Sequence, residues 1–308
     1  MQDKRMSLQE AVDRFVQDGC SFTLGSVAAR EPLGVAYEIV RQKKKNLTFI
    51  TDSSAEPGEI MIAGGCITKT ESAYIWVNMG AGYNFRRAVE KGIPNQIDTE
   101  EYSNLGMSAR FMASAHGLPY MPTKSMLGSD IVKQNPRIKV VDNPYGSGQV
   151  ALVPAVDLDV AFVHAQRCDK AGNAQIWGML ENDDIVARAA KHVVITCEEI
   201  IPTREIRKIP NMTAIPSYCV SAVVELPYGC HPLPVAGYYA MDVPFRRSMA
   251  AASRTREGIV AWMDEWIFGV DDFSGYVQKV GADRLTKLKE IENDHYRIPD
   301  IVVKEESR

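Results

Sequence analysis

The residues from Asn78 to Arg87, NMGAGYNFRR, form the stretch of this sequence best suited to hold a small anion. Glycines let a backbone approach a ligand closely, and an asparagine amide adds a hydrogen-bond donor. A helix that begins near Tyr83 would add free N–H groups, which attract negative charge. The alternative is an ordinary glycine turn followed by solvated arginines. We predict that four of these residues contact a substrate: Asn78, Gly80, Gly82 and Arg86.

Two pairs of adjacent glutamates, Glu100-Glu101 and Glu198-Glu199, are candidates for acid–base chemistry. Burial raises the pKa of a carboxyl group, and a carboxylate with a raised pKa can act as a general base. The alternative is that each pair begins a solvated helix, where acidic side chains in the first turn match the helix dipole. The residues alone leave both interpretations open.

Other motifs that carry chemistry are absent from the sequence. The six cysteines form no CxxC pair, and no histidine or cysteine pair has the spacing of metal ligands, so we predict no metal site. There is no GxGxxG, GxxxxGK[ST], GxSxG or HExxH. Each of the five histidines is expected to be structural: His116, His164, His192, His231 and His295.

The composition is that of an ordinary globular protein, with 45% hydrophobic and 24% charged residues. The net charge of −4 gives no general attraction to nucleic acid or to an anionic membrane, so an anionic ligand would need a local site. No stretch approaches the roughly 18 to 20 apolar residues that span a bilayer. The N-terminus lacks the apolar region of a signal peptide, and we expect a cytoplasmic protein.

Short apolar strands alternate with helical patterns, and these elements must position the polar residues. Ser7 and Glu10 form a capping box that begins a helix, and further helices are expected at 35–41, 58–63 and 184–190. This alternation predicts an α/β fold with an open, mostly parallel sheet and crossover helices. Strands are expected at 20–27, 47–51, 72–78, 149–153, 160–164, 193–197 and 220–224.

The central segment 119–148 carries four prolines and three glycines with little periodicity. A loop of this length usually covers a site, and an inter-lobe connection is the alternative. Residues 245–289 have a helical pattern. We expect a single domain over residues 1–308.

Five separated segments match one family in order and spacing. The most specific is HAQRCDKAGNAQIWG at 164–178, and the others are LPYMPTKSMLGSD, VITCEEI, PYGCHP and DEWIFGVDDFSGYVQKVGADRL. Over about residues 5–290 the chain resembles the class I CoA-transferases, in particular the A (α) subunit of glutaconate CoA-transferase. The resemblance implies the NagB/RpiA-like architecture of that family.

The strand and loop near the N-terminus depart from the family pattern. Relatives carry D-G-x-x…G-G-F…P there, whereas this chain has Asp18-Gly19, then Leu24 to Val27, and Pro32. The double glycine and the phenylalanine are replaced, and the loop is one residue shorter. The resemblance implies that Gly25 and Ser26 contact coenzyme A. In the central segment we predict that Lys124 meets a CoA phosphate or a substrate carboxylate and that Ser125 contacts the substrate, and a solvated lysine is the alternative.

Enzymes of this family move coenzyme A between two carboxylic acids through a glutamyl-CoA thioester. Their nucleophile lies in an E-[SN]-G motif of the B (β) subunit, and this chain has no such motif. Glu56, which precedes Pro57, is the nearest candidate, but we expect it to be an exposed loop residue or to line an interface. The resemblance implies a B-subunit partner in an α2β2 or larger assembly, an acyl-CoA and a small carboxylic acid as substrates, and no permanently bound cofactor.

Other activities are open within the same fold. Some relatives hydrolyse CoA thioesters of steroid-ring fragments with an A-subunit glutamate, which implies a catalytic role for Glu101 only in that reaction. A glutaconyl-type decarboxylase, a non-catalytic binding module, and a sugar-phosphate isomerase or deaminase are the remaining alternatives. The partner's sequence would decide among transfer, hydrolysis and decarboxylation.

Overall fold

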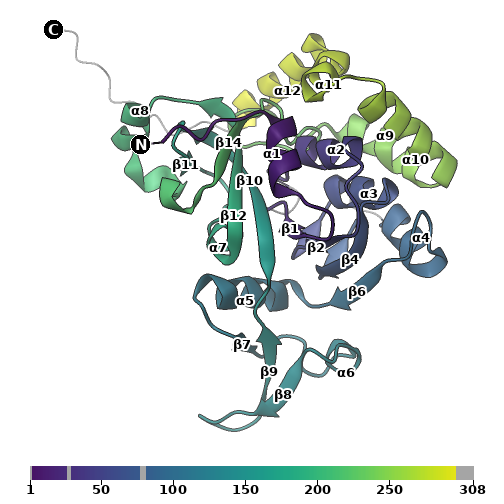
Figure 1. The fold of residues 1–308 in the computed structure, drawn as a ribbon, viewed down its shortest axis with the longest axis vertical. Coiled ribbons are helices and arrows are strands. Elements are labelled where there is room, and N and C mark those ends of the chain that lie inside the picture. Colours follow the sequence, from purple (N-terminus) through teal and green to yellow (C-terminus); the bar gives the residue numbers. More distant parts are fainter. Residues whose placement is uncertain (1, 26–28, 77–80, 296–308) are drawn as a thin grey trace.

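A parallel sheet forms the centre of the computed structural model, which describes residues 2–25, 29–76 and 81–295 (Figure 1). Each of its seven main strands runs parallel to its neighbours, and this confirms the predicted α/β fold. Two short strands, β11 (Ala174–Gln175) and β13 (Thr213–Ile215), extend it antiparallel beside β10. The spatial order is β14 (Ala222–Glu225), β12 (Ala190–Ile200), β10 (Leu158–Cys168), β1 (Ser21–Thr23), β2 (Leu47–Ile50), β4 (Ile67–Ser72) and β6 (Asp98–Glu101).

Helices cover both faces of this sheet, and each face has its own hydrophobic core. Successive side chains of a strand point to opposite faces, so Val160 and Phe162 enter one core while Ala161 and Val163 enter the other. Burial on both sides explains why the predicted strands are continuous apolar runs. Helices α1 (Leu8–Phe15), α2 (Leu33–Arg41) and α3 (Glu56–Ala63) pack on the first face, and α5 (Asn104–Ala115) and α7 (Asp183–Ala189) pack on the second.

The C-terminal part is helical, as predicted, and it packs against the core that contains α2 and α3 (Figure 1). Side chains of Asp242, Thr255 and Asp272 accept hydrogen bonds at three of the helix starts, which is why these helices begin where they do. A π-helical turn, Asp264–Phe268, joins two of them. The helices are α9 (Val243–Ser253), α10 (Arg256–Met263), α11 (Phe273–Val280) and α12 (Ala282–His295).

The central segment is an ordered arm rather than the predicted loop. Strands β7 (Tyr120–Thr123), β9 (Gln149–Pro154) and β8 (Lys139–Asp142) form a separate antiparallel sheet that projects from the main sheet (Figure 1). Short helix α6 (Ile131–Gln134) lies between β7 and β8. The predicted strand at 149–153 therefore exists, but it pairs in this arm.

The predicted strand at 72–78 is misplaced. The main-sheet strand is β4, which ends at Ser72, and β5 (Tyr74–Ile75) pairs instead with β3 (Ser53–Ser54). The sequence of β4, ITKTES, does not look like a buried strand because Lys69 and Glu71 are charged. Neighbouring side chains of opposite charge pair with both residues in the structure. Helices α4 (Tyr83–Lys91) and α8 (Thr203–Lys208) complete the fold, and α4 confirms a helix that begins near Tyr83.

Two features are absent from the described residues, 2–25, 29–76 and 81–295. None of the helices among them combines the length and the apolar character that crossing a bilayer requires. Nor do those residues bring together three or more side chains that could hold a metal ion.

Candidate active site

The carboxyl ends of β1 and β10 mark the point where the strand order reverses. From β1 the chain proceeds to β2, β4 and β6 toward one edge, and from β10 it proceeds to β12 and β14 toward the other. In open α/β sheets, ligands bind outside the carboxyl ends of the strands at such a switch point. The loops that follow β1, β2, β4 and β10 therefore frame the candidate site, and we call this side of the sheet the carboxyl edge.

Arg30 ties the loop after β1 to the loops after β10. Its guanidinium is buried, and Nη1 donates to Asp183 Oδ2 at 2.6 Å and to the carbonyl of His164 at 3.2 Å. Its Nη2 donates to the carbonyl of Met179. Gly25 has a φ of +72°, and a Cβ there would lie 2.7 Å from Asp183 Oδ1. The structure thus places predicted Gly25 at the switch point, whereas Ser26 lies outside the described residues.

Glu31 connects the same loop to the start of α3. Its buried carboxyl group accepts hydrogen bonds from the hydroxyl of Ser54 and from the N–H of Ala55 at 3.0 Å. Burial raises the pKa of Glu31 to about 8, although both hydrogen bonds act in the opposite direction. The loops after β1 and β2 are therefore joined by a carboxyl group that has little contact with water.

Glu56 begins α3 and forms a buried ion pair. Its Oε1 lies 2.6 Å from Arg246 Nε, and neither side chain is more than 1% exposed. The guanidinium of Arg246 also lies over the ring of Trp76, 5.6 Å from its centroid. The expectation of an exposed loop glutamate was wrong, because Glu56 is the first residue of a helix whose whole length is buried.

Glu59 lies one turn further along α3, and its carboxyl group contacts the N-terminus of α4. Its Oε2 accepts from the N–H of Asn84 at 2.8 Å and its Oε1 from the N–H of Phe85 at 2.8 Å. We predicted that these N–H groups attract a substrate anion, whereas in the structure a carboxyl group of the chain itself accepts from them. Burial raises the pKa of Glu59 to about 7. Gly82 is the helix N-cap, where a Cβ would lie 2.5 Å from the carbonyl oxygen of Ile75.

The other residues predicted in this segment are less informative. Arg86 is 75% exposed and pairs with Glu90 on the outer side of α4, in agreement with the solvated alternative. Arg87 points inward instead, donating to Asn84 Oδ1 at 2.7 Å and to the carbonyl of Ser253 at 2.8 Å. Asn78 and Gly80 lie outside the described residues, so their predicted contacts stay predictions.

His164 and Glu198 form a second buried network on β10 and β12. The ring Nε2 of His164 lies 2.9 Å from Glu198 Oε1, and Glu198 also accepts from the N–H of Tyr228 and the hydroxyl of Tyr239. The helix start considered for Glu198-Glu199 was wrong, because both lie on strand β12. His231 is buried between Tyr276 and Asp242, as a structural histidine would be.

Glu101 ends the edge strand β6, and Ser125 contacts the start of the helix that follows this strand. Ser125 Oγ is 2.6 Å from Ser103 Oγ, and Ser103 caps α5. The helix start considered for Glu100-Glu101 was wrong, because they end β6. The side chain of Glu101 is exposed and lines a cavity of about 200 Å³. With strands about 4.8 Å apart, β6 lies roughly 14 Å from β1.

Lys124 is exposed on the arm, immediately after β7. The structure thus does not place Lys124, Ser125 or Glu101 among the loops at the switch point. Their predicted contacts with substrate stay predictions.

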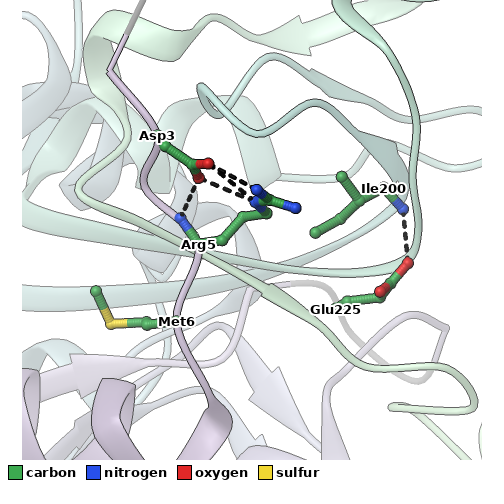
Figure 2. A pocket seen from close by; sticks show the side chains of 5 residues that line it. All are labelled: Asp3, Arg5, Met6, Ile200 and Glu225. Carbon is green, nitrogen blue, oxygen red and sulfur yellow. Dashed lines mark hydrogen bonds and ion pairs between the residues drawn. The ribbon is translucent and has the colours of Figure 1, made fainter.

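A shallow hollow of about 680 Å³ lies beside the carboxyl ends of β12 and β14 (Figure 2). Arg5 pairs there with Asp3 at 2.7 Å, and Glu225 accepts from the N–H of Ile200 at 3.1 Å (Figure 2). The ion pair is exposed, so solvent screens it. These groups satisfy one another, and the hollow offers no arrangement for chemistry.

Comparison with known sequences identifies relatives along nearly the whole chain. The family model for coenzyme A transferase matches residues 5–226. An uncharacterized protein of Archaeoglobus fulgidus is 40% identical over 95% of this chain, which spans 66% of that protein's length. The A subunit of the 3-oxoadipate CoA-transferase of Pseudomonas knackmussii is 36% identical, over 91% of this chain and 99% of that protein. The A subunit of the glutaconate CoA-transferase of Acidaminococcus fermentans is 33% identical, over 96% and 97% respectively.

Solved structures agree with this assignment. The crystal structure of glutaconate CoA-transferase from Acidaminococcus fermentans superposes with a TM-score of 0.88 at 34% identity, covering 92% of this chain and 95% of that one. Two matches carry other activities in their names. The decarboxylase AibA/AibB has a TM-score of 0.71 at 29% identity over 85% of this chain and 99% of that one. The cholesterol ring-cleaving hydrolase IpdA subunit of Rhodococcus jostii is 27% identical over 92% of this chain and 98% of that protein. This chain belongs to the coenzyme A transferase family, as a subunit of the A type.

Proposed function

We propose that this A subunit works with a B subunit whose glutamate is the nucleophile, and that the pair moves coenzyme A between an acyl-CoA and a carboxylic acid. The carboxyl edge of the A subunit lines the cleft that holds the thioester. The relatives named as the A subunits of 3-oxoadipate and glutaconate CoA-transferases support this assignment. We further propose an α2β2 or larger assembly in the cytoplasm, with the acyl-CoA as a substrate and no resident cofactor.

One observation carries the need for a partner: the chain's own buried glutamates at this edge are already engaged. Glu31 accepts from Ser54 and Ala55, Glu56 pairs with Arg246, and Glu59 accepts from α4. A nucleophilic carboxylate must reach a thioester carbonyl carbon, and these three groups are covered by protein. The attacking carboxylate is therefore expected from another chain.

The proposed reaction conserves the activation of the acyl group. The glutamate oxygen attacks the thioester carbonyl, the C–S bond breaks, and a mixed anhydride forms as CoA thiolate leaves. The thiolate then attacks the glutamyl carbonyl, which gives a glutamyl-CoA thioester and releases the first acid as its carboxylate. The acceptor acid reverses both steps. An oxyanion that develops at the thioester carbonyl needs preorganised hydrogen-bond donors, and the reacting thioester must be shielded from water, which is the part that we propose for the loops at the carboxyl edge.

Trapping the covalent intermediate tests this function. The A subunit co-purified with its B subunit is incubated with acyl-CoA and then with borohydride. We expect reduction of one B-subunit glutamate, seen as a mass change in a B-subunit peptide, and no label on this chain. The control is this chain without its partner, which should show no transfer. Trapping on this chain, or full transfer by it in isolation, would contradict the proposal.

The same assay separates the other reactions of this fold. Release of free CoA at the rate of turnover without a trapped thioester indicates the hydrolase, and release of CO₂ indicates the decarboxylase. Glu101, the catalytic candidate for the hydrolase only, is exposed on the edge strand β6 and lies outside the loops at the switch point.

Gly82→Ala is expected to lower kcat/KM for transfer at least tenfold. The added Cβ would lie 2.5 Å from the carbonyl oxygen of Ile75 and 3.2 Å from Glu59 Oε1, so the backbone at the start of α4 must shift. A displacement of about 1 Å near a reacting group can cost roughly 100-fold in rate. Steady-state kinetics of the complex provide the measurement. Gly146→Ala, in the arm, is the control and should match the unaltered protein.

A further inference from the structure

Glu59 provides a helix cap from a different helix. In α4 the N-cap is Gly82, which has no side chain to offer, yet the first N–H groups of a helix need acceptors. Glu59 supplies both carboxylate oxygens, one to the N–H of Asn84 and one to the N–H of Phe85. The amide Nδ2 of Asn84 adds a third hydrogen bond at 3.0 Å. The start of α4 is thus held by α3.

This cap also accounts for the glycine. The Cα of Gly82 lies so close to the carboxylate that an added Cβ would be 3.2 Å from Glu59 Oε1 and 3.3 Å from the Cβ of Phe85. The carbonyl oxygen of Ile75 is closer still, at 2.5 Å from the position of that added Cβ. Gly82 is therefore enclosed between β5 and the carboxylate. The carboxylate is linked to the backbone that follows Gly82 by its hydrogen bonds with the N–H groups of Asn84 and Phe85.

The elements that hold Glu59 in place are themselves fixed. All eight residues of α3 are buried, and its first turn is bonded to Glu31 through Ala55. On the other side, Arg87 donates to Asn84 Oδ1 and to the carbonyl of Ser253, which joins α4 to α9. The positive charge of Arg87 favours the ionised form of the Glu59 carboxyl group.

We propose that Glu59 is a positioning residue for transfer: it fixes Gly82 and the first turn of α4 at the carboxyl edge, so that the substrate meets a preset backbone. The N–H groups of Asn84 and Phe85 are then occupied, and the substrate carboxylate must be bound elsewhere. This inference depends on the proposed function, because it assumes that the first turn of α4 contacts a part of the substrate acid other than its carboxylate.

The test uses the complete A/B complex carrying Glu59→Gln. A glutamine has nearly the same shape but a single acceptor oxygen, so one of the two backbone N–H groups loses its acceptor. We expect KM for the acceptor acid to rise at least tenfold, with a smaller fall in kcat. Asn84→Ala removes the amide contact with Glu59 and the acceptor of Arg87 Nη1, but it leaves both backbone hydrogen bonds to Glu59, so it should raise KM by less. Glu257→Gln, an exposed glutamate of α10, is the charge-matched control.

A purely structural role would give a different result. In that case Glu59→Gln would lower the melting temperature and the fraction of active complex, and KM of the remaining active molecules would be unchanged. That outcome, or an unchanged KM in both Glu59→Gln and Asn84→Ala, overturns the inference. Failure of the proposed function is seen separately, because the unaltered complex would then show no trapped glutamyl thioester.

Discussion

Arg246→Met is expected to destabilise the protein by about 3–5 kcal/mol, the usual cost of removing one partner of a buried ion pair. Glu56 would keep its buried position at the start of α3 but lose its cation. The substitution would also remove the contact of the guanidinium with Trp76. Urea unfolding followed by circular dichroism measures the change. Arg247→Met is the matched control, because the neighbouring Arg247 is exposed, and it should change stability by less than about 0.5 kcal/mol.

The double variant Glu56→Gln with Arg246→Met gives a sharper check. If Arg246→Met lowers the free energy of unfolding because the buried Glu56 carboxylate loses the charge of Arg246, neutralising Glu56 should recover most of that free energy. Replacing both partners of a buried ion pair is often nearly neutral. Equal and additive losses from the two substitutions would contradict this explanation. In that case the packing of the arginine stem, rather than its charge, would account for the effect.

The second large effect expected is on the pH dependence of stability, through Glu31. The pKa of Glu31 is about 8 in the folded chain, against an ordinary value of 4.5. The folded state therefore holds a proton that the unfolded state releases, and the free energy of unfolding falls as the pH rises from about 4.5 to about 8. At about 1.4 kcal/mol per pKa unit, the loss amounts to roughly 3–5 kcal/mol.

Glu31→Gln should remove this part of the pH dependence. A glutamine resembles the protonated carboxyl group, since its oxygen can accept from Ala55 N–H and its amide can donate to Ser54 Oγ. We expect the variant to match the unaltered protein near pH 5 and to melt at a higher temperature near pH 9. Glu290→Gln, at an exposed position on α12, should keep the original profile. Parallel profiles for Glu31→Gln and the unaltered protein would rule out Glu31 as the source.

The strands and helices with a clear apolar period could be predicted from the sequence, and the elements with charged or irregular sequences could not. Residues close together in the sequence form the capping box of Ser7 and Glu10 and the apolar runs of β2, β10 and β12. Local sequence patterns are therefore sufficient to predict these elements. Strand β4 was missed because Lys69 and Glu71 find their counter-charges on β6 and α5, which no local pattern reveals.

Two of the predicted site residues, Gly25 and Gly82, lie at the carboxyl edge, whereas the buried glutamates there were missed. Gly82 was chosen for the freedom of its backbone and Gly25 from the family resemblance. A Cβ would lie 2.7 Å from Asp183 Oδ1 at Gly25 and 2.5 Å from the carbonyl oxygen of Ile75 at Gly82. Glu31 and Glu59 were not predicted, because their partners come from elements far along the chain. One local signal was present: glutamate followed by proline occurs twice, at Glu31 in the loop after β1 and at Glu56 where α3 begins.

The position of β1 in the middle of the sheet has a consequence for biosynthesis. One side of β1 pairs with β2, which is made soon afterward, whereas the other pairs with β10, and the hydrogen-bonded residues Ser21 and Asp159 are 138 positions apart. At about 5–20 residues per second, the ribosome needs roughly 7–30 seconds to cover that interval. During this time the side of β1 that will pair with β10 remains an unpaired strand edge in the nascent chain. Unpaired edges are prone to wrong pairing and aggregation, and chaperones protect such surfaces.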